Sequence, residues 1–350
     1  MPAIDASPPR AVILGLSGTV LTDRERRFFA AAEPLGFILF SRNIECPAQV
    51  RTLVAELRAL VGRATVPILI DQEGGRVQRL PPPHWRKAPP PAVFEPLSKR
   101  GAGLAEQATR LNSRLLAIEL AGLGITVNCA PVADVPVEGA HDIIGDRAYS
   151  RDPKQVAVLA CAACEGLLAE GVLPVVKHIP GHGRARTDSH FALPVVTAPV
   201  ATLEASDFVP FQALAGMPWA MTAHVVYTAF DPHLPATLSP TVVDTVIRGH
   251  IGFNGLLLTD DLSMRALSGD FGARTGQAFT AGCDVALHCN GDLAEMSAIV
   301  AAAPRLSEAA RMRLEQGEAV RRQHMMAVPK MNVAEAGTTL EEWLRKEPVS

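Results

Sequence analysis

The chain has 350 residues, 48% hydrophobic and 20% charged, and its 33 basic and 36 acidic side chains give a net charge of −3. This balance gives no indication of nucleic acid or an acidic membrane surface as partner, and the length suffices for a large core. No stretch approaches the roughly 18 apolar residues of a membrane span. Because the N-terminus lacks the basic and apolar regions of a signal peptide, we expect a cytoplasmic protein.

Short apolar runs alternate with longer amphipathic or alanine-rich stretches along the chain. The runs predict eight strands: Ala11–Leu16, Phe37–Phe40, Pro67–Ile70, Ile125–Cys129, Leu173–Val176, Ala220–Ala223, Gly255–Leu258 and Val285–His288. Helical patterns lie near residues 24–33, 47–62, 101–122, 153–169, 202–215, 239–249, 272–281 and 292–303. Eight such strand–helix units in ~300 residues predict an α/β fold, a single (β/α)8 TIM-type barrel.

The domain organisation follows from this alternation. We expect residues 1–10 to be an N-terminal extension, residues 11–305 the barrel, and residues 306–350 a C-terminal helix and tail that packs on or trails from it. The proline-rich segment Leu80–Pro96 predicts a stiff loop over the barrel mouth, because proline removes backbone donors and fixes φ. A proline-rich ligand for a partner domain is the alternative interpretation of this segment.

Ionisable residues follow most of the predicted strands. Asp71 follows the third strand, Lys177 and His178 the fifth, and Asp260 and Asp261 the seventh. The active sites of TIM barrels lie at the C-terminal ends of the strands. The recurrence of acids, a lysine and histidines at these positions therefore predicts a functional site rather than a set of unrelated strand ends.

The stretch from Val175 to Leu193 carries most of this chemistry. In T-D-S-H, Asp188 and His190 are close enough for the carboxylate to bond the imidazole and fix its tautomer, and such a histidine can donate and accept a proton. A metal site of His178, His182, Asp188 and His190 is the alternative interpretation. These residues lack the spacings that define established metal motifs.

The third and seventh strands add binding and catalytic candidates. A carboxylate at Asp71 can accept two sugar hydroxyls while an arginine anchors a further oxygen. A structural carboxylate–arginine pair beside the turn is the less favoured interpretation of Glu73 and Arg76. Neighbouring strand residues point to opposite faces, so only one of Asp260 and Asp261 can face the barrel axis. That carboxylate is a candidate nucleophile for a glycosidic carbon.

Five motifs together resemble a known family. D-Q-E-G-G-R-V-Q-R, G-D-R-A-Y-S, K-H-I-P-G-H-G with T-D-S-H, M-T-A-H-V-V-Y and T-D-D-L-S-M, in this order across residues of about 11 to 300, are similar to motifs of the β-N-acetylglucosaminidases of glycoside hydrolase family three. Within that family they resemble the single-domain bacterial enzymes of peptidoglycan recycling. The combination is specific, whereas no single motif is.

The resemblance implies a retaining double displacement without metal or cofactor. It assigns Asp260 as nucleophile, and His190 with Asp188 as general acid/base on a mobile loop. It implies that the terminal N-acetylglucosamine is held by Asp71, Arg79, Arg147, Lys177 and His178. The implied substrate is a small molecule, N-acetylglucosamine β-linked to 1,6-anhydro-N-acetylmuramic acid, with or without peptide.

Two features depart from the family pattern. Residue Ile179 is often Phe there, and Arg184-Ala185-Arg186 makes the loop unusually basic, which could favour an anionic substrate or acceptor. A phosphorylase remains an alternative, because a neutral histidine tolerates an incoming phosphate that a carboxylate would repel. A catalytically inactive sugar-binding barrel is a second alternative. The sequence does not define the oligomeric state, and we expect a monomer.

Overall fold

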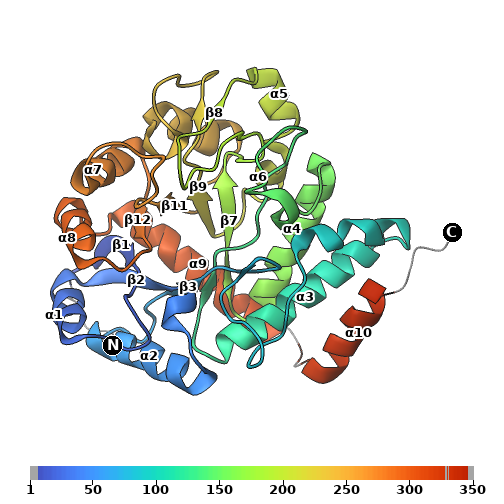
Figure 1. The fold of residues 1–350 in the computed structure, drawn as a ribbon, viewed down its shortest axis with the longest axis horizontal. Coiled ribbons are helices and arrows are strands. Elements are labelled where there is room, and N and C mark those ends of the chain that lie inside the picture. Colours follow the sequence, from blue (N-terminus) through green and yellow to red (C-terminus); the bar gives the residue numbers. More distant parts are fainter. Residues whose placement is uncertain (1–6, 328, 330, 346–350) are drawn as a thin grey trace.

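The computed structural model describes residues 7–327, 329 and 331–345. In this part of the chain, eight parallel strands close into a barrel in the order β1-β12-β11-β9-β7-β6-β3-β2, which confirms the predicted α/β TIM-type fold (Figure 1). The barrel strands are β1 (Arg10–Leu14), β2 (Pro34–Leu39), β3 (Ile68–Ile70), β6 (Val127–Asn128), β7 (Leu173–Ile179), β9 (Trp219–Thr222), β11 (Leu256–Asp261) and β12 (Val285–His288). Each overlaps one predicted strand.

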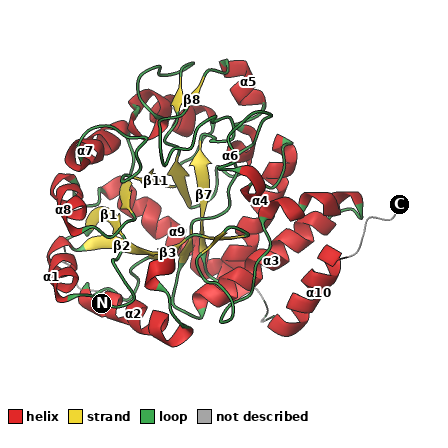
Figure 2. Cartoon of the chain, in the orientation of Figure 1, coloured by secondary structure: helices red, strands yellow, loops and turns green. Residues whose placement is uncertain are grey.

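Helices surround the strands (Figure 2). They are α1 (Asp23–Ala32), α2 (Pro47–Leu60), α3 (Leu104–Ala121), α4 (Pro153–Ala169), α5 (Val200–Ala205), α6 (Val209–Ala213), the π-helix η6 (Val242–His250), α7 (Phe271–Ala281) and α8 (Leu293–Ala302). The prediction of a single helix at 202–215 was wrong, because two short helices, α5 and α6, occupy this range. Pro210 lies in the first turn of α6, where its missing N–H is tolerated, and it could not continue α5.

Shorter elements occupy the loops. Two small sheets pair β4 (Gln72–Gly74) with β5 (Val77–Gln78) and β8 (Val195–Val196) with β10 (Val226–Tyr227). The 3-10 turns are η1 (Ser41–Asn43), η2 (Pro91–Val93), η3 (Glu95–Lys99), η4 (Gly145–Arg147) and η5 (Ala236–Leu238). Hairpin β4–β5 and turn η4 both follow barrel strands at their C-terminal ends and bring polar side chains to that end of the barrel.

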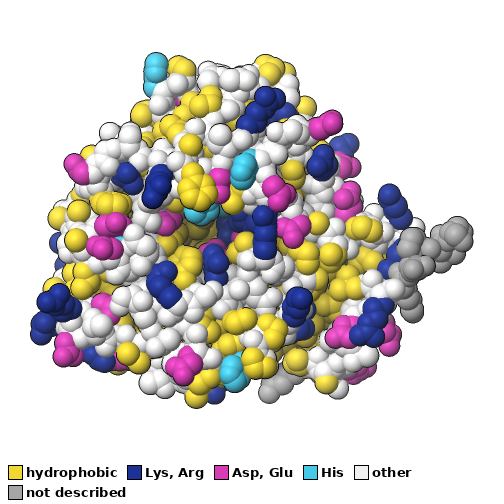
Figure 3. Space-filling view, viewed as in Figure 1, with side chains coloured by type: hydrophobic (Ala, Val, Ile, Leu, Met, Phe, Trp, Pro, Cys, Tyr) yellow, Lys and Arg dark blue, Asp and Glu magenta, His cyan; other side chains and the backbone are white. Residues whose placement is uncertain are grey.

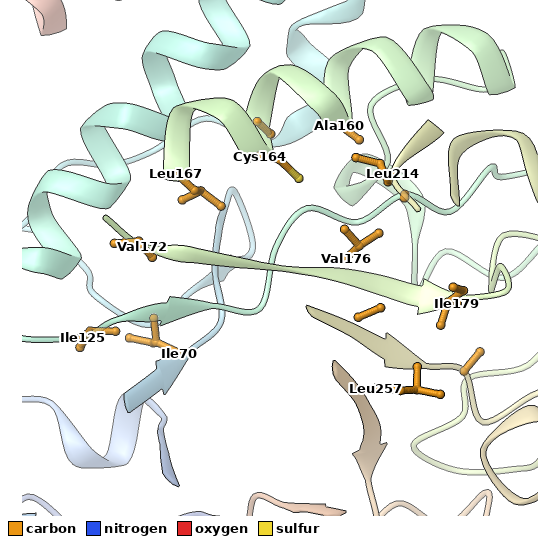
Figure 4. Packing of buried hydrophobic residues seen from close by; sticks show 14 of the residues in the cluster. Ile70, Ile125, Ala160, Cys164, Leu167, Val172, Val176, Ile179, Leu214 and Leu257 are labelled. Atoms are coloured by element: carbon orange, nitrogen blue, oxygen red, sulfur yellow. The ribbon is translucent and has the colours of Figure 1, made fainter. Parts of the chain in front are cut away.

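The hydrophobic core has two layers. One fills the barrel interior, and the other lies between the strands and the helices. In the outer layer, Ala160, Cys164 and Leu167 recur on one face of α4 and lie toward Val172 and Val176 at β7 (Figure 4). This i, i+4, i+7 spacing places one stripe of the helix on the sheet. Strand β7 is buried along its whole length, which explains why its sequence lacks polar alternation.

Two C-terminal helices pack on the barrel. Helix α9 (Glu308–Ala327) contacts the N-terminal end of the barrel, where Ala310 is buried in the interior cluster and Arg313 Nη1 lies 2.6 Å from Asp284 Oδ1. Helix α10 (Val333–Arg345) packs beside α3, with Leu340 buried in the outer layer. Residues 1–6 of the predicted extension and 346–350 of the predicted tail lie outside the described residues.

The proline-rich segment is irregular apart from 3-10 turns. It packs behind hairpin β4–β5, where Gly75 N–H donates to Ala88 O at 2.9 Å, and against α3, where Arg86 N–H donates to Glu119 Oε1 at 3.0 Å. It therefore supports the hairpin from outside. The predicted position over the barrel mouth is not confirmed, because none of residues 80–96 lines the cavity there. None of the helices in the described ranges combines the length and apolar composition needed to cross a membrane.

Candidate active site

A cavity of about 270 Å³ opens at the C-terminal ends of the barrel strands. Figure 3 shows this side of the molecule hollowed near its centre, with basic and histidine side chains around the opening. Seven of the eight predicted site residues line the cavity: Asp71, Arg79, Arg147, Lys177, His178, His190 and Asp260. The eighth, Asp188, is bonded to His190. The barrel thus brings together residues that are up to 189 positions apart.

Asp71 is held between two cations at the end of β3. Its Oδ1 accepts from Lys177 Nζ at 2.8 Å and its Oδ2 from Arg79 Nη2 at 3.2 Å. Burial alone would raise the pKa of Asp71, but Lys177 and Arg79 lower it well below its usual value. Asp71 is therefore an ionised acceptor, and its side chain keeps 14% exposure toward the cavity.

Glu73 and Arg147 form a buried pair beside Asp71. Arg147 donates from Nε at 2.8 Å and Nη2 at 2.9 Å to the two Glu73 oxygens, and Lys177 Nζ lies 2.7 Å from Glu73 Oε1. Burial opposes ionisation, yet Arg147 and Lys177 lower the pKa of Glu73 to about 2. Lys177 thus bridges two carboxylates, and Glu73 fixes Arg147 in place. The sequence left a structural pair with Arg76 as the alternative interpretation of Glu73, whereas its partner in the structure is Arg147.

Asp260 and Asp261 have different surroundings at the end of β11. The Asp261 carboxylate accepts from Ser263 N–H and Oγ and from Cys289 N–H, so it orders the adjoining loop. Asp260 Oδ1 accepts from Asp261 N–H at 2.8 Å, which leaves Oδ2 without a protein donor among the described residues. Burial would raise the pKa of Asp260, but His224 and His178 lower it. Asp260 is therefore an ionised carboxylate with one oxygen free.

Asp134 lies beneath two histidines. Its Oδ2 is 2.7 Å from His178 Nδ1, and its Oδ1 accepts from the backbone N–H groups of His178 at 3.3 Å and His182 at 2.6 Å. Since an ionised carboxylate can only accept, His178 Nδ1 carries a proton. Sequence reasoning missed the role of Asp134. Its position after an apolar strand was the available signal, but the sequence does not reveal a contact spanning 44 residues.

Asp188 and His190 form the predicted pair on the loop after β7. Asp188 Oδ1 accepts from the backbone N–H of His190 and lies 2.8 Å from His190 Nδ1. Burial alone would raise the pKa of Asp188, but the hydrogen bonds from His190 lower it below its usual value. The ionised Asp188 places a proton on His190 Nδ1 and leaves Nε2 available for proton transfer. The imidazole is 57% exposed, so the loop presents it to solvent at the cavity rim.

The histidines of the alternative metal site each form a hydrogen bond with another side chain. His178 bonds Asp134, His190 bonds Asp188, and His182 Nε2 lies 3.2 Å from Ser189 Oγ. Within the described part of the chain, no group of three or more His, Cys, Asp or Glu side chains is placed to bind a metal ion. The arrangement instead provides ionised carboxylates, cations and one exposed imidazole around a small polar cavity.

Comparisons with known proteins are consistent across sequence and structure. A sequence model described as the glycosyl hydrolase family 3 N terminal domain matches residues 21–322. The chain is 40% identical over 283 residues to a β-hexosaminidase of Alkalilimnicola ehrlichii, covering 80% of each protein. It is 38% identical over 309 residues to a β-hexosaminidase of Pseudomonas aeruginosa, covering 87% of this chain and 90% of that protein.

A solved structure is similar over nearly the whole chain. NagZ from Neisseria gonorrhoeae in complex with N-trifluoroacetyl-D-glucosamine superposes with a TM-score of 0.85 at 32% identity, covering 97% of this chain and 100% of that one.

Proposed function

The chain belongs to glycosyl hydrolase family 3 and is a β-N-acetylhexosaminidase, and from this premise we propose that it releases terminal N-acetylglucosamine from peptidoglycan fragments by a retaining mechanism. The proposed substrate is N-acetylglucosamine linked to 1,6-anhydro-N-acetylmuramic acid, with or without peptide, in cytoplasmic cell-wall recycling. The observation that carries the mechanism is the ionised Asp260 with one oxygen free in the same cavity as the Asp188–His190 pair.

The first step transfers the sugar to the protein. Asp260 Oδ2 attacks the anomeric carbon, the bond to the glycosidic oxygen breaks, and that oxygen takes the proton from His190 Nε2. Asp188 stabilises the positive charge that His190 carries before it gives up this proton. In the second step, water attacks the anomeric carbon of the glycosyl-aspartate, His190 Nε2 takes the proton from water, and Asp260 is regenerated.

The cationic cluster would hold the sugar in position. Asp71 presents carboxylate oxygens to hydroxyl groups, while Lys177 and Arg79 keep spare N–H donors beside it. Arg147 uses three N–H groups on Glu73 and the Ile143 carbonyl, and we propose that its remaining donors reach the substrate. His178 would contribute Nε2, because Asp134 occupies Nδ1.

Turnover of an aryl β-N-acetylglucosaminide and an aryl β-glucoside tests the proposal. We expect cleavage of the acetamido sugar, loss of this activity in Asp260→Ala, and retention in Asp146→Asn, which alters an acid outside the cavity lining. A 5-fluoro analogue of N-acetylglucosamine with a good leaving group should leave a covalent adduct on the wild-type protein, detected by intact-protein mass spectrometry, and none on Asp260→Ala. Full activity of Asp260→Ala would move the nucleophile elsewhere.

The natural substrate and the acceptor are tested separately. Purified N-acetylglucosaminyl-anhydromuramyl peptide should yield free N-acetylglucosamine by mass spectrometry. Added phosphate should leave the product unchanged. Formation of the sugar 1-phosphate would identify a phosphorylase, and sugar binding without turnover would identify an inactive binding barrel.

A further inference from the structure

Ser189 is a buried residue in an exposed part of the catalytic loop. It lies between Asp188 and His190 and is only 3% exposed, whereas the His190 side chain is 57% exposed and Phe191 is 72% exposed. Both hydrogen bonds of the Asp188 carboxylate go to His190, one to its backbone N–H and one to Nδ1. These bonds connect the two residues to each other and not to the barrel. The pair therefore needs another contact to fix its position relative to Asp260.

Ser189 supplies that contact twice. Its Oγ lies 3.2 Å from His182 Nε2, and its carbonyl oxygen accepts from Ala266 N–H at 3.2 Å. Between residues 186 and 193, these two are the hydrogen bonds to the remainder of the described chain. Ser189 therefore connects the loop both to the strand β7 side and to the segment that follows β11.

His182 is itself held rigidly. Its backbone N–H donates to Asp134 Oδ1 at 2.6 Å, its ring is 5.6 Å from that of His178, and the residue is 3% exposed. Nδ1 is buried without a partner, so the favoured tautomer carries its proton on Nε2 and donates it to Ser189 Oγ. Burial, and to a smaller extent the nearby His178, lower the pKa of His182 to about 4. The ring is therefore neutral near pH 7.

We propose that His182 and Ser189 are positioning residues, which place His190 over the glycosidic oxygen through the hydrogen bond between His182 Nε2 and Ser189 Oγ. The inference rests on the proposed acid/base role of His190. It extends that role to a continuous series of contacts, from His178 through Asp134, His182 and Ser189 to His190. His178, which is proposed to bind the sugar, and His190, which is proposed to protonate the leaving group, are thus both positioned through Asp134.

The experiment compares glycosides whose leaving groups differ in acidity. For kcat/KM, an alkyl glycoside or disaccharide requires protonation of the leaving oxygen, whereas a dinitrophenyl glycoside does not. We expect Ser189→Ala to lower kcat/KM for the first class about tenfold and to leave the second nearly unchanged, because a small displacement of His190 affects proton transfer alone. The Kd for N-acetylglucosamine should not change.

Further variants complete the test. Ser297→Ala, which removes an exposed hydroxyl on α8, should match the wild type. Ser189→Thr should restore most of the activity, and the Ser189→Ala/His182→Gln double variant should be no slower than the slower single variant. Equal losses on both classes of glycoside, or no loss, would overturn the positioning role. If His190→Ala itself shows no dependence on the leaving group, the acid/base assignment fails instead.

Discussion

Arg147 holds both carboxylate oxygens of Glu73, at 2.8 and 2.9 Å, with the Glu73 side chain only 1% exposed. Breaking such a buried pair leaves an uncompensated guanidinium, which costs about 3–5 kcal/mol. We expect Glu73→Ala to lower the free energy of unfolding by an amount of this order in urea denaturation. As control, Glu165→Ala removes a partner of Arg110 at the surface and should cost less than about 1 kcal/mol. Equal effects of the two variants would contradict this reasoning.

Stability should decrease with acidification in two stages. Folding lowers the pKa of His182 from 6.5 to about 4, so between these values the unfolded chain binds a proton that the folded chain does not. The contribution of neutral His182 to the free energy of unfolding is therefore present above pH 6.5 and is lost as the pH falls toward 4. Glu73, with its pKa lowered to about 2, contributes stability that is present above pH 4.5 and is lost toward pH 2. Denaturation midpoints from pH 7 to 2 measure both stages. His182→Gln should flatten the first stage, and the exposed His84→Gln should leave it intact.

Asp71→Asn tests the sugar-binding cluster. The substitution removes the charge between Lys177 and Arg79 and replaces one acceptor oxygen by a donor. Two weakened charged hydrogen bonds correspond to about a 10²-fold decrease in kcat/KM. Steady-state kinetics on an aryl β-N-acetylglucosaminide measure it. A change confined to thermal stability would show that Asp71 is only a structural counterion.

The two arginines of the catalytic loop should behave differently. Arg184 Nε donates to Asp207 Oδ2 at 2.7 Å, and the Asp207 side chain is 1% exposed, whereas Arg186 is exposed. We expect Arg184→Ala to destabilise the fold by about 2 kcal/mol, since it leaves a buried charged group without its donor. Arg186→Ala should stay within about 0.5 kcal/mol. Chemical denaturation compares them, and a KM increase only for anionic muropeptides in Arg186→Ala would assign Arg186 to the aglycone.

The sequence predicted those features that depend on local pattern. Strand β7 was recognisable because a buried parallel strand is a continuous apolar run, and Asp71, Lys177 and Asp260 were recognisable because polarity begins where such strands end. Asp188 and His190 were predictable as a pair because they are two positions apart in the sequence, a separation that their side chains can span.

Contacts between distant segments were not predictable in this way. Glu73 meets Arg147 across 74 residues, and Asp134 meets His178 across 44, and nothing in either local sequence specifies the partner. His182 was interpreted as a possible metal ligand because its type and position allow it. Only the fold shows that its ring turns to Ser189. The sequence likewise suggested that both loop arginines favour an anionic substrate or acceptor, whereas Arg184 is bonded to Asp207.

The closure of the barrel between β1 and β12 sets an order of events during synthesis. Val12 pairs with Ala286, and Ala11 N–H donates to the Pro304 carbonyl oxygen at 3.0 Å, so β1 meets this partner strand only after the rest of the barrel has been synthesised. Until β12 has been synthesised, one edge of β1 has no partner, and exposed strand edges favour association between chains. A nascent chain that stalls before β12 therefore presents an open sheet to chaperones and proteases.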